Sequence, residues 1–169
     1  MSARQYYVLD TNTIIDLHFG QLLPKIFQLP CSFLITDLLR EELLDPPFDM
    51  LAELGLLPEH LTSEEVGEIP AMMGKYPKPS YTDLSVMILA RTRNTVLITG
   101  DVALRDAAAD NGVECRGTCW LIDYLANERV ITYAEAIAAY HVILKKPRYP
   151  PKEECKALLA GWRQRQKLE

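Results

Sequence analysis

Short apolar runs of strand type alternate along this chain with stretches of helical pattern, and this alternation restricts the fold more than any other feature. Strands that alternate with helices are typical of a parallel sheet whose connections cross over its faces. The sequence therefore predicts an α/β fold. The predicted strands are residues 6–9, 32–35, 95–99 and 113–115. The predicted helices are residues 13–19, 37–44, 48–54, 63–75, 82–93, 102–111, 119–127, 132–144 and a last helix from 152 onward.

The length and hydrophobic content suit one enzyme-sized domain, since 169 residues with 49% hydrophobic content can bury a full core. We expect one main domain over residues 1–145 and a basic linker and helix over 146–169 that packs on it. The start MSARQYY has no apolar region of a secretion signal, and no window approaches the ~18 apolar residues of a membrane helix. We therefore predict a cytoplasmic protein without membrane contact.

The four cysteines are scattered, and Cys115 with Cys119 has neither a second cysteine pair nor a nearby histidine to complete a zinc site. We predict that all four, including Cys31 and Cys155, are reduced and mostly buried thiols. The histidines are isolated in sequence, and none follows a predicted strand. They are expected to be ordinary surface or packing residues.

Charge is divided unevenly between the body and the tail. Residues 145–169 hold eight basic and three acidic side chains, a net charge of +5, whereas the whole chain carries −5. The body is therefore strongly acidic. An acidic body argues against a broad nucleic-acid surface unless its carboxylates gather into a site that binds cations.

Several carboxylates of the acidic body lie where a parallel sheet would bring them together. Asp10 follows the first strand and Asp101 follows the strand VLITG, and the carboxyl ends of parallel strands share one edge. The helices between them can bring Glu42 and Asp83 to the same edge. Such a cluster repels itself unless a cation is present, and Mg²⁺ or Mn²⁺ prefers these hard oxygen ligands.

Small polar residues surround the two strand-end acids. Thr11 and Asn12 follow Asp10, and Thr99 with a glycine precedes Asp101, so a phosphate can approach and the hydroxyls can orient water or carboxylates. The alternative is helix capping, with Asp10 or Asn12 capping the first helix and Asp101 capping the helix VALRDAAAD.

The ordered segments VLDTNTIIDL, ITDLLREEL, PSYTDLSVMILA, VLITGDVALRDAA and GVECRGT resemble the PIN-domain nucleases, especially the small toxin ribonucleases of bacterial and archaeal toxin–antitoxin pairs. The resemblance spans roughly residues 6–130 and leaves the tail after 145 outside the family core. It implies a three-layer sandwich with a central parallel sheet, extra C-terminal helices and homodimers. It also implies metal ligation by Asp10, Glu42 (with Glu41 as the alternative in register), Asp83 and Asp101, supported by Asn12, Thr99 and Thr118.

The residues and the resemblance agree on metal-assisted hydrolysis of phosphodiester bonds. The predicted substrate is single-stranded RNA, since unstacked strands can enter a narrow cleft. A toxin of this kind would have an antitoxin protein as partner. The basic tail either contacts phosphates or forms a solvated helix that packs on the body.

Two rival functions use the same residues. DTNT and GDVALRD resemble motifs of haloacid-dehalogenase-type phosphatases, but the acid/base position two residues after Asp10 is Asn12, which cannot exchange a proton at neutral pH. That reading also leaves Asp83 unexplained. The second rival is a PIN-like module that binds RNA or protein without cutting.

The predicted helices 119–127 and 132–144 carry more apolar side chains than one sheet edge can easily cover. We expect part of this surface to lie in a homodimer interface. The alternative is that the tail helix, residues 153–165, folds back and buries it in a monomer.

Overall fold

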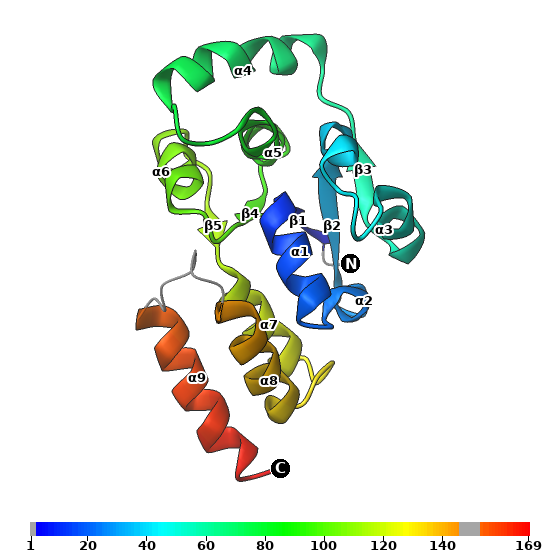
Figure 1. The fold of residues 1–169 in the computed structure, drawn as a ribbon, viewed down its shortest axis with the longest axis vertical. Coiled ribbons are helices and arrows are strands. Elements are labelled where there is room, and N and C mark those ends of the chain that lie inside the picture. Colours follow the sequence, from blue (N-terminus) through cyan, green and yellow to red (C-terminus); the bar gives the residue numbers. More distant parts are fainter. Residues whose placement is uncertain (1–2, 146–152) are drawn as a thin grey trace.

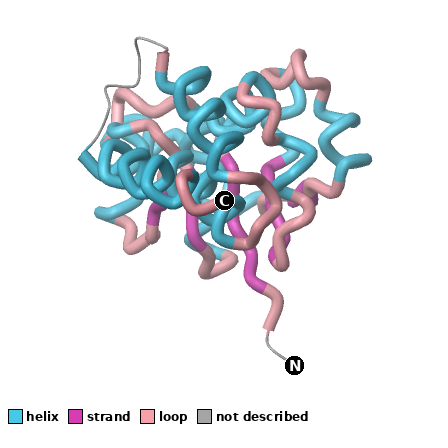
Figure 2. Tube along the Cα trace, turned by 90° about the horizontal axis from the view of Figure 1, so that it is seen from below, coloured by secondary structure: helices cyan, strands magenta, loops and turns pink. Residues whose placement is uncertain are grey.

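The computed structural model describes residues 3–145 and 153–169, and these residues form a five-stranded sheet with the order β3-β2-β1-β4-β5 (Figure 1). All neighbouring strands pair in parallel, and they lie side by side in the view of Figure 2. The predicted parallel α/β fold is therefore confirmed. The strands are β1 (Gln5–Leu9), β2 (Cys31–Thr36), β3 (Leu57–Glu59), β4 (Val96–Ile98) and β5 (Cys115–Arg116).

Helices cover both faces of the sheet and make the predicted three-layer sandwich. Figure 1 shows α4, α5 and α6 on one side and α7, α8 and α9 on the other. The helices are α1 (Thr11–Phe19), α2 (Leu23–Ile26), α3 (Phe48–Leu54), α4 (Ser63–Lys75), α5 (Tyr81–Thr92), α6 (Val102–Asp110), α7 (Thr118–Asn127), α8 (Tyr133–Leu144) and α9 (Glu153–Gln166), with a 3₁₀ helix η1 (Asp37–Glu41) after β2.

The core includes the sheet and the middle of α5. Central strand residues such as Val8 and Leu97 are fully buried, and so is every residue of α5 from Leu84 to Ala90. This helix is enclosed because it packs on β1, β2 and β4, with α4 and α6 against it. Its N-terminus is thereby held close to the end of β1. On the other face, the ring of Tyr7 packs at a tilt against Trp120 of α7, with ring centroids 5.4 Å apart.

Three local predictions need correction. The strand β3 and the short helix α2 were not predicted, and the segment predicted as a helix over 37–44 forms only η1. Pro46 and Pro47 follow this segment, and a proline disfavours helical backbone in the residue before it. The strand β3 contains Pro58, which is tolerated because β3 lies at the edge of the sheet.

The helix α9 folds back on α7 and α8. Leu159 and Trp162 are buried, and the Trp162 indole N–H donates to the Asp123 carboxylate at 2.8 Å. The apolar surface of α7 and α8 on which the homodimer was predicted is therefore partly covered within the monomer. The homodimer stays a prediction. Of the predicted linker KKPRYPP, residues 146–151 lie outside the described ranges.

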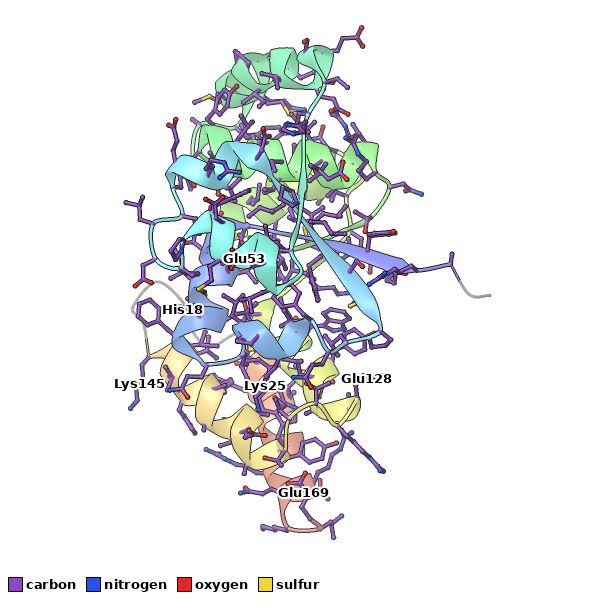
Figure 3. All side chains as sticks on the ribbon, turned by 90° about the vertical axis from the view of Figure 1, so that its right-hand side faces the viewer. His18, Lys25, Glu53, Glu128, Lys145 and Glu169 are labelled. Carbon is purple, nitrogen blue, oxygen red and sulfur yellow. A yellow bond between two sulfur atoms is a disulfide. The ribbon has the colours of Figure 1, made fainter. Side chains whose placement is uncertain are left out.

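A salt bridge also connects helices α2 and α8. Lys25 of α2 points toward α8, where its ammonium group donates to Glu135 at 2.8 Å (Figure 3). Both side chains are partly exposed, so this pair contributes well under 1 kcal/mol and mainly orients α2. In residues 3–145 and 153–169, no helix is long and apolar enough to cross a membrane.

The prediction that all four cysteines are reduced is wrong for two of them. Cys119 of α7 and Cys155 of α9 form a disulfide, with Cα atoms 5.7 Å apart, whereas Cys31 and Cys115 are free. The partners are 36 residues apart in sequence, and only the folding back of α9 brings them together. Spacing alone could not reveal this pair.

We expect protein prepared in air and unfolded in urea without reductant to show two titratable thiols, and four after reduction. A chromogenic thiol reagent measures both values. Cys119→Ser should raise the number before reduction to three, because it releases Cys155, while Cys31→Ser should lower it to one. Four thiols in the unreduced protein would contradict the disulfide.

Candidate active site

The carboxyl ends of β1 and β4 are neighbours, and two of the predicted acids follow them. Leu9 of β1 pairs with Ile98 of β4, so Asp10 and Thr99 come next to each other. The Thr99 hydroxyl donates to the Asp10 carboxylate, and the same hydroxyl oxygen accepts the Asp101 N–H at 3.1 Å. Thr99 therefore links the two acids, and its supporting role stays a prediction.

Asp10 is a fully buried carboxylate. One of its oxygens accepts the Thr13 N–H at 2.7 Å and caps α1, as the capping alternative predicted. Burial raises the pKa of Asp10 to about 6, against the lowering effect of its bonds to Thr13 and Thr99, and the negative charge of Asp83 raises it further. The ionisation of this carboxyl group therefore costs free energy in the folded protein, and a bound cation would offset that cost.

Glu42 reaches the same edge from the end of η1. Its carboxylate accepts the Thr11 hydroxyl at 3.0 Å and the Thr82 hydroxyl through the other oxygen. These threonines directly follow Asp10 and directly precede Asp83, so Glu42 lies between the starts of α1 and α5. Glu41 and Glu42 both have exposed side chains, and the two threonine hydroxyls bind the carboxylate of Glu42. The geometry thus places Glu42, rather than Glu41, beside the other acids.

The other two acids cap helices. Asp101 accepts the Leu104 N–H at 2.7 Å at the start of α6. Asp83 accepts the Ser80 N–H at 2.9 Å in a capping box at the start of α5. The capping role is therefore present at this edge: the carboxylates fix helix starts, and the helix starts hold the carboxylates in place. Metal ligation by these acids stays a prediction.

The donor set suits a hard divalent cation, although it is not a closed cage. Within the described ranges, no three Asp, Glu, His or Cys side chains gather closely enough to hold a metal ion by themselves. The acids approach one another through threonine hydroxyls instead. Carboxylate and hydroxyl oxygens without thiol or imidazole are the chemistry that Mg²⁺ and Mn²⁺ take, and Mg²⁺ keeps several waters in such sites.

The remaining predicted residues lie farther from this network. Asn12 is half-buried in the first turn of α1, next to the Asp10 cap. Thr118 is the first residue of α7 and is buried to 8% exposure. It lines a cavity of about 40 Å³ that also touches Gly100, the residue before Asp101. Thr118 therefore adjoins the acidic edge without bonding to its carboxylates.

Two residues of the site were missed by sequence reasoning. Thr82 was overlooked although it directly precedes Asp83, and its hydroxyl proves to bind Glu42. Arg105 was overlooked because its signal is only a helical spacing of four from Asp101. Its Nε donates to the Thr99 carbonyl oxygen at 3.1 Å, which places the guanidinium group next to Thr99.

The sequence profile described as PIN domain matches residues 6–163, which is nearly the whole chain. The chain belongs to the PIN-domain family. This PIN-domain match includes most of α9, which the sequence motifs had left outside the family core. PIN domains are generally metal-dependent nucleases.

Comparison with individual proteins adds little to the family assignment. No curated protein matches the chain. A solved structure of a PilT N-terminus domain protein from the hyperthermophilic archaeon Sulfolobus solfataricus P2 is similar to this PIN domain, with 17% sequence identity and a TM-score of 0.49. The alignment covers 69% of this chain and 90% of that one.

Proposed function

We propose that this PIN domain is an endoribonuclease that hydrolyses phosphodiester bonds in single-stranded RNA with Mg²⁺ or Mn²⁺. The observation that carries the proposal is the hydrogen-bonded network at the carboxyl edge of the sheet. It joins Asp10 to Asp101 through Thr99, and it joins Glu42 to the residues beside Asp10 and Asp83 through two threonines. The side-chain atoms that form these bonds are carboxylate and hydroxyl oxygens.

In this proposal Asp10, Glu42, Asp83 and Asp101 hold the metal, together with water. The bound metal supplies an activated water and neutralises charge on the leaving oxygen. The protein's own contribution is positional. Thr99 holds the Asp10 and Asp101 segments together, while Thr11 and Thr82 hold Glu42. In this proposal water attacks the phosphorus, the bond to the 3′-oxygen breaks and that oxygen takes up a proton, so the products carry a 5′-phosphate and a 3′-hydroxyl.

Family resemblance supports a finer proposal, that the chain is the cytoplasmic toxin of a toxin–antitoxin pair. The antitoxin would insert a side chain or helix at the acidic edge and compete there with the metal. A small acidic or DNA-binding protein encoded directly upstream would support this proposal, and its absence would favour an RNA-processing role.

The proposal is tested by incubating 5′-labelled single-stranded RNA with the purified chain in Mg²⁺, in Mn²⁺ and in EDTA. We expect cleavage only with metal, and a loss of at least about 100-fold in Glu42→Gln, because that change removes a charged metal ligand. Glu41→Gln is the matched control and should cut at the wild-type rate. Metal-independent cleavage, or equal loss in both variants, would contradict the proposed site. Tight RNA binding without any cleavage would favour the non-catalytic module.

Replacement of Asn12 by Asp separates the nuclease from the phosphatase reading. In a haloacid-dehalogenase-type enzyme, the new carboxyl group would supply the missing acid/base and raise hydrolysis of a small aryl phosphate by about 100-fold or more. In a PIN nuclease it adds only another negative charge next to Asp10. We therefore expect no gain in aryl phosphate hydrolysis, measured by release of the coloured phenolate. A large gain would support the rival.

A further inference from the structure

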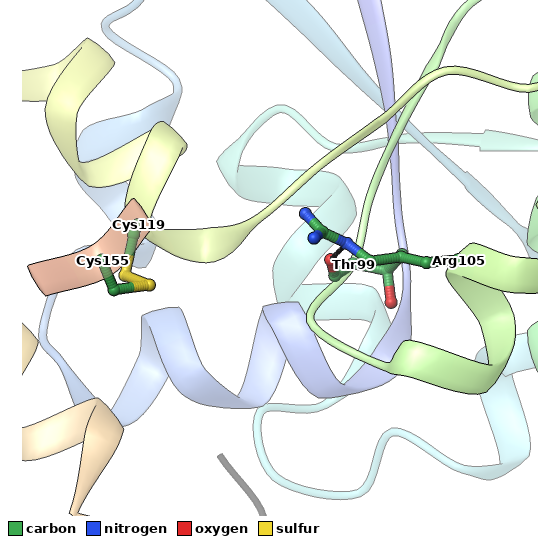
Figure 4. Close-up of a disulfide and its surroundings, with 4 residues drawn as sticks. All are labelled: Thr99, Arg105, Cys119 and Cys155. Carbon is green, nitrogen blue, oxygen red and sulfur yellow. Dashed lines mark hydrogen bonds between the residues drawn. A yellow bond between two sulfur atoms is a disulfide. The ribbon is translucent and has the colours of Figure 1, made fainter. Parts of the chain in front are cut away.

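The strongest feature outside the acidic network is the disulfide between Cys119 and Cys155, which joins the starts of two helices. Cys119 is the second residue of α7 and Cys155 is the third residue of α9, and their Cα atoms are 5.7 Å apart. Figure 4 shows the two sulfur atoms where these helices meet. The partners are 36 residues apart in sequence, so the bond fixes the start of α9 to a distant segment of the chain.

The two halves of α9 are held to the protein in different ways. In the second half, the buried Trp162 indole donates to Asp123 at 2.8 Å, and Arg165 donates to Asn127 at 2.9 Å. In the part of the chain that the structure describes, no hydrogen bond or salt bridge joins residues 153–158 to another element. The disulfide and side-chain packing fix this first half. Breaking the disulfide would therefore loosen the start of α9 and leave its second half docked.

The two bonded sulfur atoms differ in their access to solvent. Cys119 is only 4% exposed, whereas Cys155 is partly exposed. A thiolate breaks a disulfide by attacking a sulfur atom that it can reach, so a small thiol from solution meets Cys155 first. Cys119 is then the leaving sulfur. A second thiol molecule displaces the first one from Cys155 and completes the reduction.

The other two cysteines do not compete in this exchange at neutral pH. Burial raises the pKa of both the Cys31 and the Cys115 thiol to about 11. Only a small fraction of each is therefore the thiolate, which is the form that attacks a disulfide. Exchange with a small thiol is thus directed to one pair of cysteines, without scrambling among all four.

We propose that Cys119 and Cys155 form a reversible redox clamp, which a small thiol such as glutathione opens and glutathione disulfide closes. Opening breaks one S–S bond: the pair gains two electrons and two protons, and two thiol molecules are oxidised to one disulfide. Closing is the reverse exchange. The closed clamp fixes the start of α9. In the cytoplasm, where this chain is predicted to be, a disulfide is usually transient or redox-sensing. The clamp does not depend on the proposed ribonuclease function.

The first measurement determines whether the pair exchanges with small thiols in the folded protein. The full chain is equilibrated without denaturant in a large excess of reduced glutathione and is then transferred to a large excess of glutathione disulfide. Acid quenching, alkylation and peptide mass spectrometry give the reduced fraction of each cysteine. We expect the pair to be reduced in the first buffer and to re-form in the second, through a mixed disulfide on Cys155. A pair that stays oxidised in excess thiol, or that does not re-form, would overturn the clamp, as would a mixed disulfide found on Cys119 instead.

The second measurement determines what the bond holds in place. Hydrogen exchange of backbone amides, followed by mass spectrometry, compares the oxidised and the reduced protein. We expect reduction to speed exchange at residues 157–160 about tenfold or more and to leave residues 163–166 within about twofold, because Trp162 still anchors the second half. Equal rates at residues 157–160 in both states would contradict the clamp. Equal acceleration in both halves would also contradict it, because the disulfide would then support the whole helix.

Two variants make this result independent of the redox buffer. Cys155→Ser removes the bond, so residues 157–160 should exchange fast in both buffers. Cys115→Ser is the matched control, because it removes a free thiol and should switch as the wild type does. Slow exchange in Cys155→Ser, or loss of switching in Cys115→Ser, would overturn the proposal. Circular dichroism verifies that each variant is folded, and the wild type in its two redox states provides the test without any substitution.

Discussion

Replacement of Asp101 by Asn is expected to lower metal-dependent RNA cleavage by at least about 1,000-fold, equivalent to about 4 kcal/mol of transition-state stabilisation. The fold should survive, because Asn caps helices as well as Asp does and can still accept the Leu104 N–H. What disappears is the negative charge that holds a divalent cation. Initial rates on labelled single-stranded RNA at saturating Mg²⁺ measure the effect, and urea unfolding measures the stability.

The matched control is Asp106→Asn. Asp106 lies on the same helix, α6, but is exposed and does not cap it. It should cut at the wild-type rate. If Asp101→Asn retains activity within tenfold of the wild type, Asp101 is a capping residue only, and the metal site has to be sought elsewhere.

The fold could be predicted where local pattern and tertiary packing favour the same structure. Helices α3 and α4 have the predicted bounds, since α3 lies between Pro47 and Gly55 and α4 begins with a capping box. The predictions fail where a single strong residue competes with the pattern. A proline pair ends the segment after β2 as η1, and β3 is a three-residue edge strand with a proline in its middle. Such a strand exists only because β2 offers its free edge.

The sequence predicts which edge of the sheet carries the candidate site, but it does not predict the side-chain contacts within it. A run of buried residues that stops at an acid fixes the edge on which Asp10 and Asp101 lie. The choice between Glu41 and Glu42 needs the turn geometry of η1, which decides which side chain meets Thr11 and Thr82. No sequence rule gives the direction in which each side chain at the end of η1 points.

Contacts between distant segments were beyond sequence reasoning for a different reason. The Cys119–Cys155 disulfide and the burial of Trp162 both depend on the return of α9 over α7 and α8. The sequence leaves open whether a basic amphipathic tail folds back or binds another molecule, because both outcomes bury the same side chains. Only the structure shows that α9 packs on α7 and α8 of its own chain.

Replacement of the buried Asp10 by Asn is expected to stabilise the metal-free protein at neutral pH. The pKa of Asp10 is about 6 in the folded protein against an ordinary value of 3.8, so between these two values the folded state binds more protons than the unfolded state. Stability linked to Asp10 is therefore fully present below about pH 4, falls as pH rises and is lost above about pH 6. The full pKa shift corresponds to a loss on the order of 3 kcal/mol in the free energy of unfolding between low and neutral pH.

Asn at position 10 avoids the cost of a buried negative charge, because it is neutral at every pH. It also keeps the hydrogen bonds with Thr13 and Thr99. Its carbonyl oxygen can accept the Thr13 N–H, and the Thr99 hydroxyl can rotate to accept from its amide. Urea unfolding in EDTA measures the effect. The variant should exceed the wild type by up to about 3 kcal/mol at pH 7.5 and by little at pH 4, with Asp106→Asn matching the wild type at both. Added Mg²⁺ should close the gap by stabilising only the wild type, since binding to the native state raises its stability. A gap that is the same at both pH values would contradict a buried, titrating Asp10, and a gap that Mg²⁺ leaves untouched would contradict its role as a metal ligand.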